Sequence, residues 1–316
     1  MSEDEHGREI LHPPHPSRHG DPLSVPELPR DDPEAAGRIR ALLASPSYVQ
    51  ADSDIEFLNS AGTRGVRLQL DYLKAEQLLE AHRVEHTIVV FGGTRIPEPK
   101  AARRAVERLR DARGDGQAED LERRLRIAER ILDNSRYYEV AREFGRIVGD
   151  AEETAGEGRL VVATGGGPGI MEAANRGSFD AGARSVGFNI HLPQEQYPNA
   201  YITPELCFEF HYFAVRKLHF LLRARALVLF PGGYGTLDEL FETLALVQTR
   251  TIDPVPVVLV GEEFWKRAVN FDFLVDEGVI DREDRELFSY AETAQEIWDG
   301  IVRWHDRRGA PLISRR

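Results

Sequence analysis

Residues 226–239 read Ala-Leu-Val-Leu-Phe-Pro-Gly-Gly-Tyr-Gly-Thr-Leu-Asp-Glu, and they are the most informative stretch of the chain. The apolar run Ala226–Phe230 is typical of a buried strand, and three glycines within four residues follow it. Thr236 to Glu239 then indicate the start of a helix. A strand that feeds a glycine turn at a helix N-terminus forms an anion site, because unpaired N–H groups point outward and the helix dipole adds positive potential. The phosphate of a nucleotide is the natural ligand.

Composition and charge narrow the class of protein. The chain has 316 residues, 41% of them hydrophobic, which is enough for one large domain or two small ones. The net charge of −13 argues against a nucleic acid or an anionic membrane as partner, because either would favour a basic face. With Cys207 as the single cysteine, no apolar run of membrane length and an acidic, polar start, the sequence predicts a cytoplasmic enzyme or binding protein.

The first 50 residues differ in composition from the rest. They are rich in Pro, Asp, Glu, His and Arg and poor in large apolar residues, so we expect a mostly disordered tail with one short helix near Pro33–Leu43. His12, His15 and His19 lie in this tail, but prolines surround them and no acidic or cysteine partner completes a metal site.

Residues 51–316 are expected to form a single domain in which strands and helices alternate. The predicted strands are Thr87–Phe91, Arg159–Ala163, Ser185–Ile190, Leu206–Phe210, Ala226–Phe230 and Val255–Val260. The predicted helices are Tyr137–Val148, Ile170–Ala181, Phe213–Ala224, Leu237–Gln248, and one each near Phe264–Glu277 and Thr293–His305. This alternation predicts a doubly wound parallel α/β sheet with helices on both faces.

Two helical additions are expected around this sheet. Apolar residues between Ile55 and His82 suggest helical packing onto the core, and the charged residues 98–133 suggest a solvated helical hairpin with a break at Gly114–Gly116. In a doubly wound sheet, ligands bind at the carboxyl ends of the strands, so the glycine turns should meet at one edge.

A second glycine-rich turn, Gly165–Gly169, follows a predicted strand and opens a helix at Ile170. Glycines let the backbone approach a ligand closely and adopt positive φ. Neither turn matches G-x-G-x-x-G or ends in the GK[ST] of a P-loop, so a standard NAD site or an NTPase is disfavoured. Either turn alone could be a tight βα connection, but the two together favour a mononucleotide pocket.

Three carboxylates follow the first turn. Thr236-x-x-Glu239 has the pattern of a capping box, in which the glutamate binds the start of its own helix. Asp238 and Glu242 lie beside Glu239, and the pattern alone does not choose which carboxylate carries chemistry.

The basic pair Arg216-Lys217 lies on an otherwise apolar predicted helix. It could be a solvated surface pair. Its apolar surroundings favour instead a partner at the beginning of the helix, such as a phosphate or a carboxylate near the strand ends.

Together these motifs resemble the LOG (Lonely Guy) family, whose older members were often labelled "possible lysine decarboxylase". The resemblance rests on Gly-Gly-Gly-Pro-Gly-Ile-Met-Glu (165–172), Arg216-Lys217 and Pro-Gly-Gly-Tyr-Gly-Thr-Leu-Asp-Glu (231–239). It covers about residues 87–301, and the N-terminal helix and charged insert look like the longer bacterial members. It implies a Rossmann-like fold, usually a dimer or built from dimers, and a phosphoribohydrolase that splits AMP or cytokinin riboside monophosphates into free base and ribose 5-phosphate.

The resemblance also implies roles for individual residues. The catalytic pair is Arg216 and Glu239. The implied substrate-binding residues are Gly92, Gly93, Thr94, Gly165, Gly166, Gly167, Gly169, Met171, Glu172, Glu195, Lys217, Gly232, Gly233, Tyr234, Gly235 and Thr236. No metal or cofactor is implied, and a lysine decarboxylase is not expected because no pyridoxal phosphate motif is recognisable.

The sequence departs from the short plant-type members at two places. Ala214 stands where they have His, and Phe91-Gly92-Gly93-Thr94 stands where they have Cys-Gly-Ser-Ser. Both positions are expected to line the pocket, so these changes bear on which base the protein prefers. Two alternatives therefore stay open: a nucleotide-binding sensor without turnover, and a nucleosidase for other purine or pyrimidine monophosphates.

Overall fold

The computed structural model describes residues 32–112, 118–155, 160–191 and 197–312. The chain divides into two compact units, residues 1–64 and 65–316. The predicted tail is thus described only from residue 32, and the predicted break at Gly114–Gly116 lies outside the described residues.

The described part of the first unit consists of short helices. α1 (Ala35–Leu43) confirms the helix expected near Pro33–Leu43. α2 (Ile55–Leu58) begins after Asp54, whose carboxylate accepts a hydrogen bond from the Phe57 N–H at 2.9 Å. Two 3-10 turns, η1 (Pro46–Tyr48) and η2 (Ala61–Thr63), complete this part.

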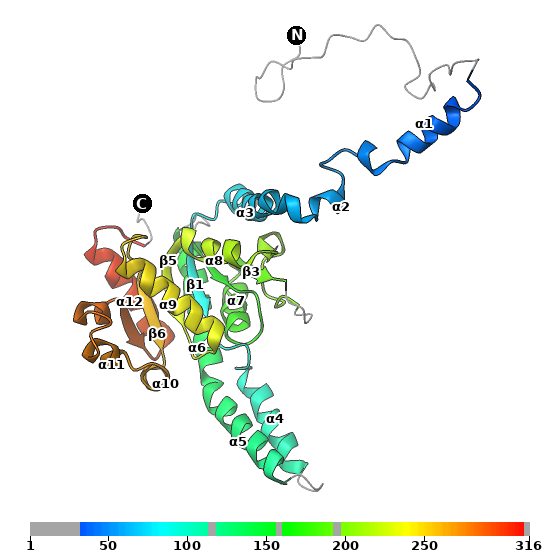
Figure 1. Ribbon diagram of the computed structural model, residues 1–316. Coiled ribbons are helices and arrows are strands. Elements are labelled where there is room, and N and C mark those ends of the chain that lie inside the picture. The colour runs from blue at the N-terminus through cyan, green and yellow to red at the C-terminus, as the bar shows by residue number, and fades with distance from the viewer. Residues whose placement is uncertain (1–31, 113–117, 156–159, 192–196, 313–316) are drawn as a thin grey trace. The chain divides into compact units, whose positions relative to one another are not determined.

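The second unit is built on a parallel sheet that, within the described residues, has seven strands in the order β4-β3-β2-β1-β5-β6-β7 (Figure 1). The strands are β1 (His86–Phe91), β2 (Leu160–Thr164), β3 (Ser185–Ile190), β4 (Cys207–Phe210), β5 (Ala224–Leu229), β6 (Val257–Val260) and β7 (Phe288–Ala291). Six of them confirm the predicted strands. The central strands are buried on both faces, which explains their continuous apolar runs.

The seventh strand corrects the expectation of six. β7 has four residues at the edge of the sheet, and it follows the charged 3-10 turn η4 (Arg282–Glu286). Only Phe288 and Ala291 are buried, so the segment carries no apolar run that would predict a strand.

Helices cover both faces of the sheet. The helices of this unit are α3 (Arg64–Ala81), α4 (Pro99–Asp111), α5 (Ala118–Asn134), α6 (Arg136–Ala155), α7 (Ile170–Asp180), α8 (Phe213–Leu222), α9 (Tyr234–Gln248), α10 (Glu262–Ala268), α11 (Phe271–Asp276) and α12 (Ala294–Arg307), with a 3-10 turn η3 (Pro204–Leu206). Ile88 and Val90 of β1 pack with α6, α7 and α12, whereas Val89 and Phe91 pack with α3, α8, α9 and α10. The alternation of side chains along a strand produces these two cores.

The prediction of a single helix near Phe264–Glu277 is wrong, because α10 and α11 are separate helices. Val269 between them is extended, and the Asn270 side chain caps α11 by accepting from the Phe273 N–H at 3.0 Å.

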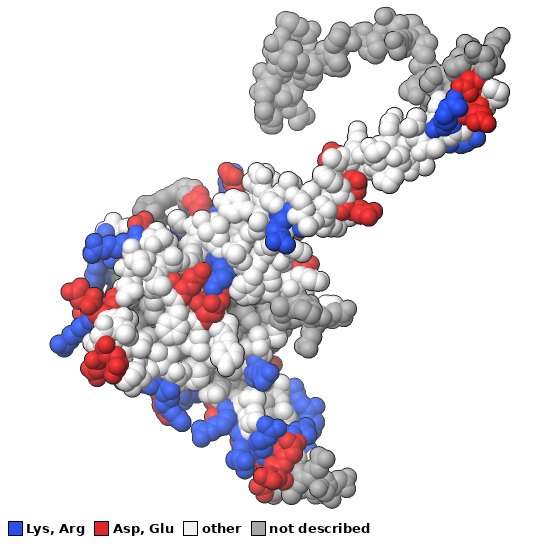
Figure 2. Space-filling model, viewed as in Figure 1, with Lys and Arg blue, Asp and Glu red and all other residues white. Residues whose placement is uncertain are grey.

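The charged segment forms two paired helices, α4 and α5, as predicted. Figure 2 shows basic and acidic side chains side by side on them, and Arg110 pairs with Glu129 at 2.8 Å across the hairpin.

The order of strands places the topological switch point between β1 and β5. The chain runs outward from β1 through β2 and β3 to β4, and then returns to pair β5 with the other side of β1. Ligands of doubly wound folds bind at the carboxyl ends of the strands at such a point. The Rossmann-like architecture is therefore confirmed, and it directs attention to the turns that follow β1, β2 and β5.

Candidate functional site

The three glycine turns contact one another at the carboxyl edge of the sheet. The Gly93 N–H donates to the Pro231 carbonyl at 2.9 Å, and the Ile170 N–H donates to the Gly93 carbonyl at 3.3 Å. Gly169 has φ +74°, and a Cβ there would lie 2.4 Å from the Gly93 oxygen. The structure thus brings together the turns that the sequence predicted at one edge.

The turn after β5 leads directly into α9. Gly233 occupies the N-cap position without a side-chain cap, and the Thr236 N–H donates to the Gly233 carbonyl at 3.0 Å. A Cβ at Gly232 would lie 2.1 Å from the Thr236 hydroxyl oxygen, so only glycine fits. The first N–H groups of the helix have no intrahelical acceptor, which makes this terminus suited to an anion.

The capping box expected from Thr236 and Glu239 is wrong. α9 begins at Tyr234, so Thr236 already lies in the first turn and Glu239 lies in the second. At that position the Glu239 side chain is beyond the free N–H groups of the helix start, which end with the first turn. Helix capping therefore does not explain the presence of Glu239 at this position.

Glu239 is a buried carboxylate, only 4% exposed. Burial raises its pKa to about 7, and the nearby positive charges of Lys217 and Arg216 oppose this shift only partly. Its side chain makes no hydrogen bond or ion pair with any residue that the structure describes. A carboxyl group with a pKa near neutrality can exchange a proton at physiological pH, as catalytic carboxylates do.

The other two carboxylates of α9 have a partner. Lys217 of α8 donates to Asp238 at 2.7 Å and lies 3.0 Å from Glu242. Burial lowers the pKa of Lys217, but these two contacts outweigh it and the pKa is raised overall. Lys217 thus contacts both Asp238 and Glu242, so Glu239 is the one of the three without a direct partner among the described residues.

Arg216 lies inward from Lys217 on the same helix. Its Nε donates to the Phe188 carbonyl at 2.6 Å, and its guanidinium lies 4.9 Å from the centre of the Phe220 ring. A Cβ on Gly165 would lie 2.5 Å from Nη2, so the guanidinium rests against the second glycine turn. Burial lowers the pKa of Arg216, and the charge of Glu239 counteracts this.

Both members of the basic pair therefore reach partners, and the solvated alternative is wrong. Arg216 rests against the second glycine turn, and its charge and that of Glu239 act on one another electrostatically. The pair Arg216 and Glu239 that the resemblance implied is thus assembled from α8 and α9 at the switch point.

The remaining predicted residues are placed as follows. The Met171 sulfur approaches Gly165, and the Glu172 carboxylate accepts a hydrogen bond from the Tyr138 hydroxyl at 2.9 Å. Thr94 and Tyr234 are exposed. A Cβ on Gly92 would lie 2.5 Å from Ile170, whereas Gly233 and Gly235 have open space around them. Glu195 lies outside the described residues.

Several polar residues near the turns were not predicted. A Cβ on Gly166, which has φ +74°, would lie 2.1 Å from the Asn189 side-chain oxygen. Asn199 donates from its side chain to the Gly166 and Gly167 carbonyls, each at 3.2 Å. Arg95 is exposed on the turn after β1. The available signal was position, because Asn189 and Arg95 are polar residues at the carboxyl ends of predicted strands.

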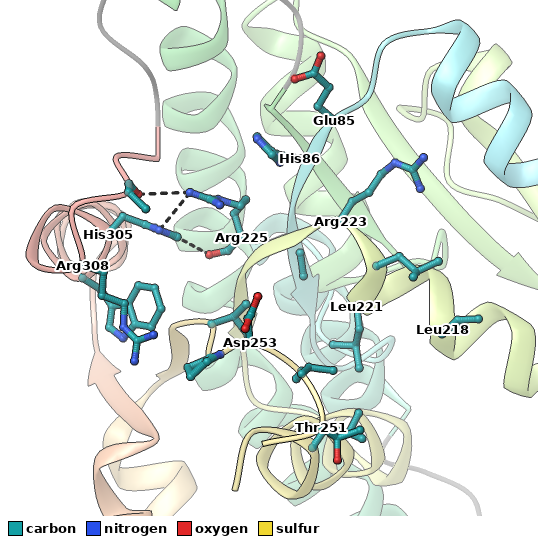
Figure 3. Close-up of a pocket in the computed structure, with 18 residues that line it drawn as sticks. Glu85, His86, Leu218, Leu221, Arg223, Arg225, Thr251, Asp253, His305 and Arg308 are labelled. Atoms are coloured by element: carbon teal, nitrogen blue, oxygen red, sulfur yellow. Dashed lines mark hydrogen bonds between the residues drawn. The ribbon is translucent and has the colours of Figure 1, made fainter. Parts of the chain in front are cut away.

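A separate cavity of about 870 Å³ lies at the end of the sheet where the strands begin, opposite to the carboxyl ends (Figure 3). The starts of β1 and β5, the ends of α8 and α12 and the segment after α9 line it. There the His305 Nε2–H donates to the Arg225 carbonyl at 2.8 Å, and Arg225 donates to the Ala310 carbonyl at 3.3 Å. Because all strands are parallel, this cavity is remote from the glycine turns.

The residues that the structure describes contain no group of three or more His, Cys, Asp or Glu side chains that could hold a metal ion. They also contain no helix long and apolar enough to cross a membrane.

The fold and the site define a Rossmann-like α/β protein with a buried glutamate and a partly buried arginine beside its glycine turns. The family model described as "possible lysine decarboxylase" matches residues 171–301. A relative from Oryza sativa subsp. japonica, the probable cytokinin riboside 5′-monophosphate phosphoribohydrolase LOGL3, is 30% identical over 177 residues, which are 51% of this chain and 78% of that protein. The chain belongs to the LOG family.

Two further similar proteins match over a shorter stretch or at lower sequence identity. Cytokinin riboside 5′-monophosphate phosphoribohydrolase LOG3 of Arabidopsis thaliana is 30% identical over 141 residues, which are 43% of this chain and 64% of that protein. The solved structure of the Moco carrier protein from Chlamydomonas reinhardtii is 18% identical, with a TM-score of 0.41 and coverage of 71% of this chain and 99% of that chain.

Proposed function

We propose that this protein is a nucleoside 5′-monophosphate phosphoribohydrolase that hydrolyses the N-glycosidic bond of AMP or a cytokinin riboside monophosphate. The observation that carries the proposal is Glu239, a buried carboxylate with a raised pKa beside Arg216 and the glycine turns. The printed names of the relatives, cytokinin riboside 5′-monophosphate phosphoribohydrolases, support the substrate class.

Substrate binding is expected to begin with the phosphate. The free N–H groups at the start of α9 and the helix dipole favour an anion at Gly232–Thr236. The phosphate is remote from the bond that breaks, so its binding energy serves to orient the ribose. The second glycine turn, Gly165–Gly169, would then face the ribose or the base.

Glu239 is assigned the chemical step. Breaking an N-glycosidic bond builds positive, oxocarbenium-like charge on the ribose, and a carboxylate beside the ring stabilises it. The same carboxylate can orient or deprotonate the attacking water. The products are the free base and ribose 5-phosphate.

Arg216 is assigned to holding the reacting groups in register. Its Nε is committed to the Phe188 carbonyl, which leaves the Nη groups for Glu239, a ribose hydroxyl or the phosphate. A guanidinium suits this task, because its donors are rigid and form bidentate contacts.

Lysine decarboxylation, the older label of the family, finds no support at this site. A Schiff-base lysine must be neutral to attack, which requires a lowered pKa. Lys217, the lysine beside the glycine turns, has a raised pKa because Asp238 and Glu242 hold its charged form.

A homodimer is part of the proposal. Phe213, Leu218 and Leu222 of α8 are 46–48% exposed, and Phe241 of α9 is 41% exposed. Apolar side chains gathered beside a site favour coverage by a second copy. Light scattering coupled to size-exclusion chromatography would show a mass of twice 35.6 kDa or a multiple of it. A cytoplasmic location and the longer bacterial type stay predictions.

A panel of nucleotides tests the proposed activity. Purified protein is incubated with AMP, isopentenyladenosine monophosphate, a pyrimidine monophosphate and adenosine, and free base is followed by chromatography. Release from a purine monophosphate but not from adenosine is expected, because the phosphate orients the substrate. Binding without release from any nucleotide would show a sensor instead, and release from the pyrimidine alone would overturn the substrate class.

A further inference from the structure

One side chain, Asn199 on the segment between β3 and β4, holds the carbonyl side of the second glycine turn. The main-chain N–H of Asn199 donates to the Gly166 carbonyl at 2.8 Å. Its side-chain Nδ2 donates to the Gly166 and Gly167 carbonyls, each at 3.2 Å. Two successive carbonyls of the turn are thus held by the same residue.

A buried chain of hydrogen bonds fixes Asn199 in this orientation. Its Nδ2 also donates to Asn175 Oδ1 at 2.9 Å, and Asn175 is 0% exposed. The same oxygen accepts from the Thr164 hydroxyl at 2.7 Å, and that hydroxyl accepts from the Gly166 N–H at 3.0 Å. Nδ2 has two N–H groups for these three oxygens, so one N–H is shared between two acceptors. The side-chain oxygen of Asn199 accepts from the Tyr201 N–H at 3.2 Å, which fixes the orientation of the amide.

The arrangement fixes the direction of one N–H of the turn, that of Gly167. In a trans peptide, the carbonyl of one residue and the N–H of the next point in opposite directions. The Gly166 carbonyl faces Asn199, so the Gly167 N–H points away from it. Gly167 is buried, and its N–H, like those of Gly165 and Gly169, meets no acceptor among the residues that the structure describes. Buried N–H groups nearly always have a partner, so this one is suited to a ligand.

We propose that Asn199 is a positioning residue that aims the Gly167 N–H at an oxygen of the ribose 5-phosphate part of the substrate. This inference rests on the proposed function for the identity of the ligand. Asn199 acts through the glycine turn and does not itself contact the substrate. Its loss is expected to weaken binding more than it slows the chemical step, because Glu239 and Arg216 stand on other elements.

Asn199→Asp tests the proposal with a nearly isosteric change. The carboxylate keeps the oxygen that accepts the Tyr201 N–H at 3.2 Å, but it cannot donate to the Gly166 and Gly167 carbonyls. Calorimetry is used to measure the affinity for AMP and for ribose 5-phosphate, and steady-state kinetics to measure KM and kcat. We expect both affinities to fall about tenfold and KM to rise equally, with kcat within threefold of the wild type.

Thr203→Val is the matched control on the same segment. Its hydroxyl accepts the Ser185 N–H at 3.0 Å, away from the glycine turn. This variant should lose thermal stability but keep both affinities within twofold. If Asn199→Asp lowers the melting temperature by more than Thr203→Val does, Asn199→Ser, which introduces no charge beside the carbonyls, replaces it in the same measurements.

The outcomes separate this inference from the proposed function. Unchanged affinities in a folded Asn199 variant would overturn the positioning role even if AMP is hydrolysed. If the wild type releases no base but binds AMP, a tenfold loss in the variant supports the positioning role while the proposed function fails. A wild type that binds neither AMP nor ribose 5-phosphate overturns both.

Discussion

Glu239 differs from Asp238 and Glu242 because it makes no ion pair with Lys217, whereas they both do. Asp238 and Glu242 share the ammonium group, and both keep contact with it at 3.0 Å or less. Glu239 is buried and makes no direct contact with this ammonium group, although the charges of Lys217 and Arg216 both act on it. A pattern of three acids in five residues could not show this, because the distinction depends on where α8 crosses α9.

The raised pKa of Glu239 predicts the pH dependence of the reaction. Burial raises this pKa to about 7, so the group is protonated below pH 7 and charged above it. If the carboxylate is the active form, kcat/KM with AMP should rise about tenfold per pH unit below 7 and level off above it. A rate profile that is flat or falls between pH 5.5 and 8.5 would exclude this role.

The same pKa predicts a cost in stability. In the unfolded chain Glu239 titrates at its ordinary pKa near 4.3, so between about pH 4.3 and 7 the folded state binds more protons and stability falls as pH rises. Glu239→Gln removes the buried charge, and above pH 7 it should stabilise the fold by about 1–3 kcal/mol relative to the wild type. Thermal unfolding at pH 5 and pH 8 checks this, since an equal difference at both pH values would refute it.

At the scale of elements, the site is a contact between turns and helix starts. Arg216 of α8 rests against Gly165, and Gly232 rests against Thr236 of α9. The sequence motif contains these glycines, and the packing explains why larger residues do not fit. The start of α9 was predicted three residues late, because the Thr-x-x-Glu pattern imitates a capping box while Gly233 takes the N-cap position.

Gly165→Ala tests the contact between the second turn and Arg216. The new methyl would lie 2.5 Å from the guanidinium and 3.0 Å from the Met171 sulfur, so Arg216 must move. We expect kcat with AMP to fall about ten- to a hundredfold, since small displacements of positioning groups are costly. Gly300→Ala on α12 is the control, because no atom lies within 4 Å of the added Cβ. Equal activities of the two variants would contradict the assignment.

At the scale of the whole molecule, the alternation of apolar runs and helices predicted the sheet. Six strands could be predicted because buried parallel strands appear in the sequence as uninterrupted apolar runs. The meeting of the three glycine turns could be predicted because the carboxyl ends of parallel strands lie at the same edge of the sheet. β7 escaped prediction because an edge strand needs few buried residues. Asn189 and Asn199 escaped because their importance comes from contacts across the fold, which single-residue patterns do not encode.

The opposite edge of the sheet predicts a second, independent pH effect. Burial lowers the pKa of His305, which holds the end of α12 against Arg225 at the start of β5. A histidine with a lowered pKa contributes stability that is present above its unfolded pKa of about 6.5 and is lost as pH falls. Melting temperature should therefore drop between pH 6.5 and 5, and His305→Gln should flatten this slope. A slope that is unchanged in the variant would assign the effect to other groups.

The central claim is that Glu239 breaks the bond between ribose and base in a bound nucleoside monophosphate. The most direct measurement compares base release from AMP by the wild type and by Glu239→Gln, with AMP affinity measured on both. The wild type should release adenine and ribose 5-phosphate in equal amounts. The variant should bind AMP within about threefold of the wild type and release base at least about a hundredfold more slowly. Normal turnover by Glu239→Gln would contradict the account.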